Sequence, residues 1–195
     1  MGADHRVSTW VFGYGSLVSP VSLGSTIGRV PMRGKNFLGA DCRGWERRWN
    51  YGYRFSPERY RGRDVSNIDT VVALGIVANS SAVMNGVIAA VSEAELAFLD
   101  QREVRYEQVD VTSEVTLLEG DVTSLSIDRI VTYVPTEAPI ADYLDARDRG
   151  TAGIEIRYWN LVNSAFHDLL PGEGERFQVL TLDPDIPVVD VSRIE

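Results

Sequence analysis

A chain of 195 residues with 44% hydrophobic content is long enough for one ordinary core, and its net charge of −9 argues against nucleic acid as a general partner. No apolar window approaches the roughly 18 to 20 residues that cross a bilayer, and residues 1–9 are too polar for a signal peptide. Cys42 is the only cysteine, which excludes an internal disulfide and a cysteine metal cluster. We therefore expect one soluble cytoplasmic domain over residues 1–195, without a membrane partner.

The first predicted strand, residues 9–12, runs into a loop with little side chain, Gly13-Tyr14-Gly15-Ser16-Leu17. A glycine inside a strand indicates a bulge or the close approach of another group, and Gly15 permits dihedral angles closed to other residues. Successive N–H groups of Gly15, Ser16 and Leu17 could form a concave donor array for a carboxylate or a developing oxyanion. An ordinary strand-to-loop turn explains the same residues without any function.

Residues 41–63 combine seven arginines with six aromatic residues. One interpretation is a solvated loop whose arginine stems cover aromatic rings. The other is that one or two arginines bind the carboxylate of an anionic small molecule, because the guanidinium fork suits that geometry. Within this region, residues 37–53 contain at least one strand and residues 56–69 form a loop. The preceding segment, residues 19–29, is partly helical.

A capped helix stands in the middle of the chain, between predicted strands. The apolar runs 70–78 and 86–91 predict two strands of one sheet, separated by a turn at residues 79–81. Ser92 with Glu95 makes a capping box, which starts a helix over residues 92–103. The alternating pattern of residues 108–118 predicts a half-buried strand, and residues 130–134 predict another.

Helical patterns follow over residues 139–149 and 154–170, and the tail from 177 to 195 is rich in proline and aspartate, which favours extended chain. We divide the chain into a motif-bearing core of about residues 10–135, a helical part of about 139–171 and this tail. Strands lie before and after the capped helix without strict alternation, so the pattern favours an α+β fold over a doubly wound parallel sheet.

Glu103 is the strongest candidate for a chemical role. At 100° per residue it falls on the same helix face as Leu96 and Leu99, which points toward the core. Burial there should raise its pKa from about 4.3, and the helix C-terminus also disfavours negative charge. Two alternatives remain: an ion pair with a nearby arginine such as Arg102 or Arg105, or a helix that ends early and leaves Glu103 in solvent.

Other catalytic motifs are missing from the sequence. The glycine loop does not form GxGxxG, no GxxxxGK[ST] phosphate loop occurs, and Ser16 does not lie in a GxSxG elbow. The two histidines, His5 and His167, lack the HExxH or CxxC context of metal sites. We therefore predict no metal and expect both histidines to be surface or packing residues.

The chain resembles the gamma-glutamylcyclotransferase-like family, most closely its branch that cleaves glutathione. Four stretches within about residues 10–111 carry the resemblance: residues 12–17 (FGYGSL), residues 44–49 (GWERRW), the strand pair 71–91, and residues 98–103 (FLDQRE) followed by Tyr106. Two features depart from the family pattern. Arg105 stands where glycine commonly precedes the tyrosine, and the basic stretch after Arg54 differs.

The resemblance implies a small, closed, β-barrel-like mixed sheet with flanking helices, a cavity at one end and no cofactor. It implies that Glu103 is the catalytic acid and base, and that the loop from Tyr14 through Gly15, Ser16 and Leu17 binds the gamma-glutamyl group. For Tyr106 we expect a hydrogen bond to that group. The implied reaction is attack of the substrate's α-amino group on its own gamma-carbonyl, which releases 5-oxoproline without a protein nucleophile.

Glutathione is the first substrate expected, gamma-glutamyl dipeptides the second and gamma-glutamylamines the third. A non-catalytic small-ligand binding module on the same fold is the competing class, with Glu103 held in an ion pair. A purely structural interaction domain is a third possibility, and it predicts no cavity between the two motifs.

Overall fold

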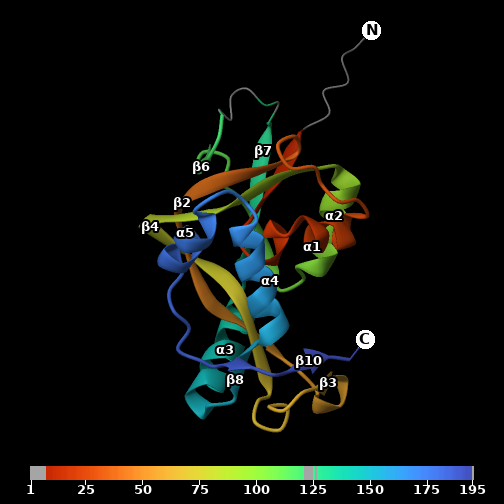
Figure 1. Ribbon diagram of the computed structural model, residues 1–195, viewed down its shortest axis with the longest axis vertical. Helices are drawn as coiled ribbons and strands as arrows, with labels where there is room; N and C mark the ends of the chain where they lie inside the picture. The colour runs from red at the N-terminus through yellow and green to blue at the C-terminus, as the bar shows by residue number, and fades with distance from the viewer. Residues whose placement is uncertain (1–7, 121–124, 126, 195) are drawn as a thin grey trace.

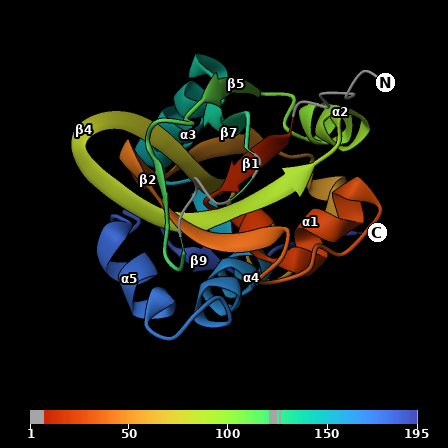
Figure 2. The same cartoon turned by 90° about the horizontal axis from the view of Figure 1, so that it is seen from above.

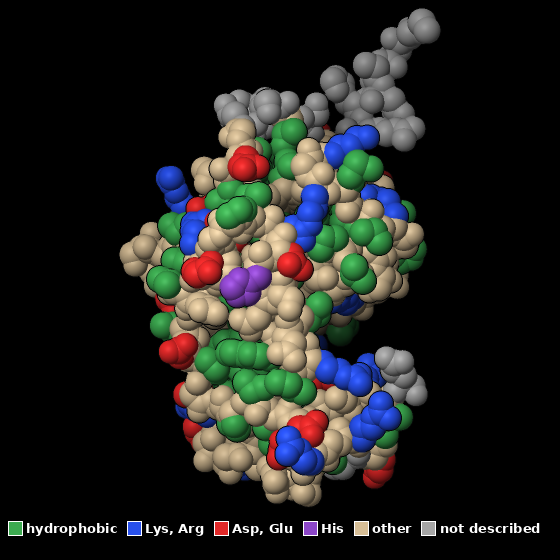
Figure 3. All heavy atoms as spheres, viewed as in Figure 1, with side chains coloured by type: hydrophobic (Ala, Val, Ile, Leu, Met, Phe, Trp, Pro, Cys, Tyr) green, Lys and Arg blue, Asp and Glu red, His purple; other side chains and the backbone are tan. Residues whose placement is uncertain are grey.

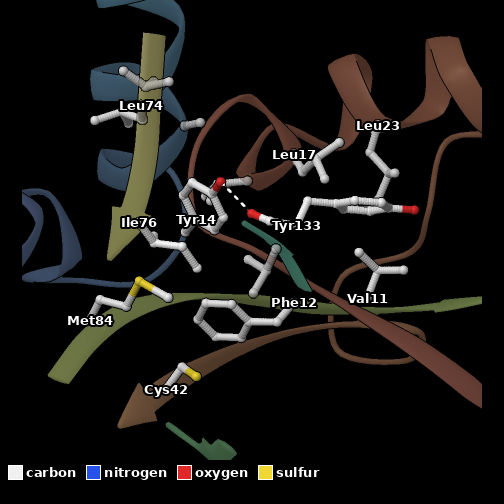
Figure 4. Packing of buried hydrophobic residues seen from close by; sticks show 14 of the residues in the cluster. Val11, Phe12, Tyr14, Leu17, Leu23, Cys42, Leu74, Ile76, Met84 and Tyr133 are labelled. Atoms are coloured by element: carbon white, nitrogen blue, oxygen red, sulfur yellow. Dashed lines mark hydrogen bonds between the residues drawn. The ribbon is translucent and has the colours of Figure 1, made fainter. Parts of the chain in front are cut away.

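Strand β1 (Thr9–Gly13) runs through the centre of the molecule, and all five of its residues are buried. The computed structural model (Figure 1) describes residues 8–120, 125 and 127–194. In it, β1 pairs antiparallel with β4 (Thr70–Val91) and parallel with β7 (Arg129–Pro135). Figure 4 shows Phe12 of β1 beside Met84 of β4 and near Cys42. The predicted first strand is thus confirmed, and the structure places it inside a mixed sheet.

The main sheet follows the order β5–β7–β1–β4–β2–β6. Its further strands are β2 (Phe37–Arg54), β5 (Tyr106–Asp110) and β6 (Val115–Leu117), while β8 (Ala152–Glu155) joins β4 to β9 (Val188–Val189). Among the described residues, the strands at the two ends of this order, β5 and β6, do not pair with each other, so hydrogen bonds do not close the sheet into a barrel. Strand β4 nevertheless curves strongly (Figure 2). The α+β class with a mixed sheet is confirmed.

Helices cover this sheet in two groups. Helix α1 (Pro20–Ile27) packs against α2 (Glu93–Arg102), and α4 (Ile156–His167) lies beside α5 (Glu173–Leu180). Helix α3 (Glu137–Arg149) packs on β2. Two 3-10 turns, Ser16–Val18 and Pro57–Arg59, and a small ribbon of β3 (Tyr60–Arg61) with β10 (Ser192–Arg193) complete the fold.

Strand β4 corrects the prediction of two strands with a turn between them. It continues through all 22 residues because β2 pairs with it on both sides of residues 79–82, from Thr70 to Ala89. The irregularity lies at Gly44 of β2, whose φ of +81° suits a bulge opposite these residues. The side chain of Asn79 still makes turn contacts, since its oxygen accepts from the N–H and the hydroxyl of Ser81, while its amide donates a 2.6 Å hydrogen bond to Glu46 of β2.

Three other sequence predictions need correction. The single strand expected over residues 108–118 is two strands, because the Asp110 carboxylate accepts hydrogen bonds from the backbone N–H and the hydroxyl of Thr112 and turns the chain. The tail expected to be extended from residue 177 begins inside α5, where Phe177 stacks on Phe166 with ring centroids 4.4 Å apart. Residues 154–155 belong to β8, so α4 begins at Ile156.

The arginine-rich segment is a strand of the sheet in its first half, which corrects the interpretation as a solvated loop. Arg47 is completely buried, with its guanidinium 4.7 Å from the ring of Phe166 and 4.9 Å from that of Phe177. The guanidinium also donates hydrogen bonds to Asn85 and Thr181. Burial lowers the pKa of Arg47 to about 9, and stacking with hydrogen bonds offsets part of the desolvation cost.

The surface mixes both signs of charge. On the face seen in Figure 3, acidic and basic side chains are interspersed with hydrophobic ones. Arg149 illustrates the pairing, since it lies 2.6 Å from Asp69 and 3.2 Å from Asp145. Within the described residues, no helix is long and apolar enough to cross a membrane, and no cluster of three or more metal-ligand side chains occurs. His167 is exposed, as expected, while His5 lies outside the described residues.

Candidate active site

A cavity with about 320 Å³ of empty space, including its open mouth, lies where the loop after β1, the end of α2 and the start of β5 meet. It brings together all the residues that the sequence singled out as a site. The lining consists of Phe12, Tyr14, Gly15, Ser16, Leu17, Leu74, Glu103, Tyr106, Tyr133 and Tyr158. Such a cavity between the two motifs argues against the purely structural interaction domain.

Glu103 reaches the cavity because α2 is fixed at its start and ends at the residue before it. The Ser92 hydroxyl accepts from the N–H of Glu95, and the Glu95 carboxylate accepts from the N–H of Ser92 at 2.8 Å, which completes the predicted capping box. Leu99 is fully buried on the same face, and only 14% of the Glu103 side chain is exposed. The inward direction predicted for Glu103 is confirmed.

Burial raises the pKa of the Glu103 carboxyl, and the neighbouring Arg102 opposes that change. The ion pair foreseen as an alternative also exists, with Arg102 Nε 3.3 Å from Glu103 Oε1. Desolvation outweighs this contact, so the carboxyl is more readily protonated than an ordinary glutamate. A carboxyl whose pKa is raised in this way is better suited than an ordinary glutamate to donate a proton as well as to accept one.

The cavity wall opposite Glu103 is the glycine-containing loop that follows β1. Gly13 is required there because a Cβ atom would lie 2.7 Å from Cβ of Leu17. The chain then turns, with the N–H of Val18 bonded to the Gly15 carbonyl at 3.0 Å. In the described part of the chain, the N–H groups of Gly15, Ser16 and Leu17 have no hydrogen-bond acceptor. The loop therefore offers backbone donors beside the cavity.

Phenols form most of the remaining wall. Tyr14 donates a 2.6 Å hydrogen bond to the carbonyl of Tyr133 (Figure 4), and Tyr106 donates one of 3.4 Å to the carbonyl of Leu74. The hydroxyl of Tyr158 accepts from the N–H of Leu74 at 3.4 Å. Burial raises the pKa of each of these three phenols, that of Tyr158 to about 12. They remain protonated at neutral pH, which leaves Glu103 as the acid–base group of the lining.

Sequence reasoning missed Tyr133 and Tyr158. Both lie in elements that the hydrophobic pattern predicted, one in β7 and one in α4, and an aromatic residue there is typical of a core. No local motif distinguishes them from packing residues. The sequence singled out the arginines of residues 43–63 as possible ligands for a carboxylate, but none of them lines this cavity.

Solved structures with the same architecture include a gamma-glutamyl cyclotransferase, with a TM-score of 0.57, 16% identity and coverage of 93% of both chains. An uncharacterized protein from Homo sapiens matches with a TM-score of 0.58, 17% identity and 93% coverage of each chain. YkqA from Bacillus subtilis matches with a TM-score of 0.53 and 13% identity, over 88% of this chain and 53% of the other. No protein-family model and no curated protein matches the sequence. The chain therefore has the gamma-glutamyl cyclotransferase fold.

Proposed function

We propose that this protein is an enzyme that releases 5-oxoproline from a gamma-glutamyl compound. The observation that carries the proposal is the placement of Glu103 opposite the backbone donors of the loop from Gly15 to Leu17. Glu103 is the one carboxylate that the described residues contribute to the cavity lining. The shared fold and the desolvated carboxylate support the same reaction class. The free thiol of Cys42 is buried and suits a reducing compartment, so we propose the cytoplasm as its location.

The proposed reaction is an intramolecular acyl transfer. Glu103 takes a proton from the substrate's α-amino group, and that nitrogen attacks the gamma-carbonyl carbon, whose π electrons move to oxygen. The tetrahedral intermediate then collapses with cleavage of the original carbon–nitrogen bond, and Glu103 returns its proton to the leaving nitrogen. The products are 5-oxoproline and an amine, so the step consumes neither water nor a cofactor.

Two features of the cavity would lower the barrier. A positioned acid–base group contributes about 10² to 10⁴ in rate. Each backbone donor aimed at the developing oxyanion contributes about 3 to 4 kcal/mol. The N–H groups of Gly15, Ser16 and Leu17 would supply these donors, and the walls would hold the substrate folded for ring closure. For Tyr106, we propose a hydrogen bond to the gamma-glutamyl group.

The substrates we propose, in order, are glutathione, gamma-glutamyl dipeptides and gamma-glutamylamines. The test is mass-spectrometric detection of 5-oxoproline after incubation with each, using wild type, Glu103→Gln and Glu107→Gln. Glu107 is an exposed carboxylate four residues further along, which makes it a matched control. We expect product from wild type and Glu107→Gln, and a loss of about 10² or more in kcat for Glu103→Gln. Retained turnover in a folded Glu103→Gln protein would remove Glu103 from the mechanism.

The contact between Arg102 and Glu103 favours a second candidate, a binding module without catalysis. In that case the ion pair would neutralise the carboxylate, and the cavity would only hold a ligand. This candidate predicts no 5-oxoproline from any of the three substrate classes, together with saturable binding of at least one of them by calorimetry. Turnover of any one substrate excludes it.

A further inference from the structure

Arg102, the last residue of α2, connects both walls of the cavity although it does not line the cavity itself. Its Nε lies 3.3 Å from Oε1 of Glu103, and its Nη2 donates a 2.8 Å hydrogen bond to the hydroxyl of Ser16. One rigid guanidinium plane therefore joins the carboxylate on one wall to the donor loop on the other.

The same guanidinium is fixed from a third direction by α1. Nη1 donates a 2.8 Å hydrogen bond to the Thr26 hydroxyl and one of 3.3 Å to the carbonyl of Ser22, while Nη2 lies 3.4 Å from the Ser22 hydroxyl. Only 29% of the Arg102 side chain is exposed. Contacts with three segments distinguish it from a surface ion pair, whose two partners are usually free to separate.

We infer that Arg102 is a positioning residue, which holds the carboxylate of Glu103 and the loop at Ser16 in one fixed relation around the substrate. This inference rests on the proposed function. The contact of Arg102 with Oε1 lies on one side of the carboxylate and would leave Oε2 of Glu103 to face the substrate. A displacement of about 1 Å between such groups can cost about a hundredfold in rate.

Arg102 also supplies the charge that acts on Glu103. Five phenols interact electrostatically with Glu103: Tyr14, Tyr51, Tyr106, Tyr133 and Tyr158. Burial raises the pKa of each phenol, so all are neutral at neutral pH. The other charged side chains near this helix end are engaged elsewhere, Arg105 with Asp142 and Asp100 with the Tyr133 hydroxyl.

Two substitutions separate charge from geometry. Arg102→Gln removes the charge, so the acidic limb of the kcat/KM profile should move to higher pH, and kcat should fall about 10- to 100-fold. Arg102→Lys keeps a positive charge but loses the planar fork that spans Glu103 and Ser16. It should keep the acidic limb near the wild-type position while kcat still falls.

The matched control is Arg29→Gln. Arg29 pairs with Glu95 at 2.5 Å and so also attaches α2 to the region of α1, but it does not contact Glu103. We expect the control to lower thermal stability and to leave the acidic limb unmoved. If Arg102→Gln behaves as Arg29→Gln does, with lower stability alone, Arg102 is merely structural and the inference is overturned.

A second measurement keeps this inference separate from the proposed function. The side-chain carboxyl carbon of Glu103, assigned by its loss in Glu103→Gln, is titrated by carbon-13 NMR in wild type, Arg102→Gln and Arg29→Gln. We expect a higher midpoint in Arg102→Gln alone. An unmoved midpoint overturns the inference whatever the activity, whereas absence of 5-oxoproline with wild type overturns the proposed function.

Discussion

The hydroxyl of Tyr14 donates a 2.6 Å hydrogen bond to the carbonyl oxygen of Tyr133, which lies 119 residues further along the chain. The bond joins the loop after β1 to strand β7, and both residues line the same cavity. Tyr14 is only 7% exposed. This buried phenol therefore helps to fix the loop that carries the backbone donors.

Replacing Tyr14 by phenylalanine removes that bond and keeps the ring. We expect the free energy of unfolding in urea to fall by about 1 kcal/mol, because the carbonyl of Tyr133 loses a buried donor. Turnover should fall as well, since the loop is less firmly held. Tyr53→Phe is the control, because Tyr53 is 44% exposed and should change neither quantity. Unchanged stability in Tyr14→Phe would contradict the prediction.

Glu103→Gln should stabilise the protein at neutral pH. The pKa of Glu103 is raised in the folded state, so ionisation costs folded-state stability as the pH rises through that pKa. Below the unfolded-state value of about 4.3 both states are protonated and this cost disappears. The melting temperature of Glu103→Gln relative to wild type should therefore increase from pH 4 to pH 8. A difference that stays constant over this range would show that Glu103 has an ordinary pKa.

Arg47→Lys should destabilise the fold by about 2 to 4 kcal/mol. A lysine cannot reproduce the planar stack against Phe166 and Phe177 or the fork of hydrogen bonds to Asn85. Arg48→Lys, at an exposed neighbour paired with Glu46, should stay within about 0.5 kcal/mol of wild type. Urea denaturation of the two variants measures the contrast, and equal effects would refute it.

Gly13→Ala should cost about 1 to 3 kcal/mol through overpacking. Its new methyl group would meet Cβ of Leu17 at 2.7 Å, and that atom belongs to the cavity loop. In Gly39→Ala, also in a strand, the nearest atom is a terminal methyl of Leu118 at 3.0 Å, which can rotate away. The loss of melting temperature should be clearly larger for Gly13→Ala, and the reverse order would contradict the packing described.

Much of the site could be predicted because its signals are local. Ser92 and Glu95 fix the start of α2, and Glu103 follows Leu96 by seven positions on one face, so the spacing favoured an inward carboxylate over the alternatives. The glycine loop is likewise contained in five consecutive residues. Tyr133 and Tyr158 carry no such signal, because their place in the cavity depends on how β7 and α4 pack against distant elements.

The incorrect fold predictions concern interactions between distant residues. The predicted turn at Asn79 to Ser81 does not end the strand, because β2 pairs with β4 both before and after these residues. The first residues of the tail predicted from residue 177 belong to helix α5, where Phe177 packs on Phe166. Nothing in the basic segment around Arg47 indicates its burial, because the two rings that enclose its guanidinium belong to distant residues.

The enclosure of Arg47 also constrains the order in which the protein can fold during synthesis. Its strand, β2, is made early, but Phe177 and Thr181, which stack on and bond to its guanidinium, are made more than 120 residues later. Until these residues leave the ribosome, the guanidinium of Arg47 lacks the Phe177 ring and the Thr181 hydroxyl that bury and bond it in the folded protein. The amino-terminal half is therefore expected to remain incompletely packed on the ribosome, and to reach its final core only after synthesis has passed residue 181.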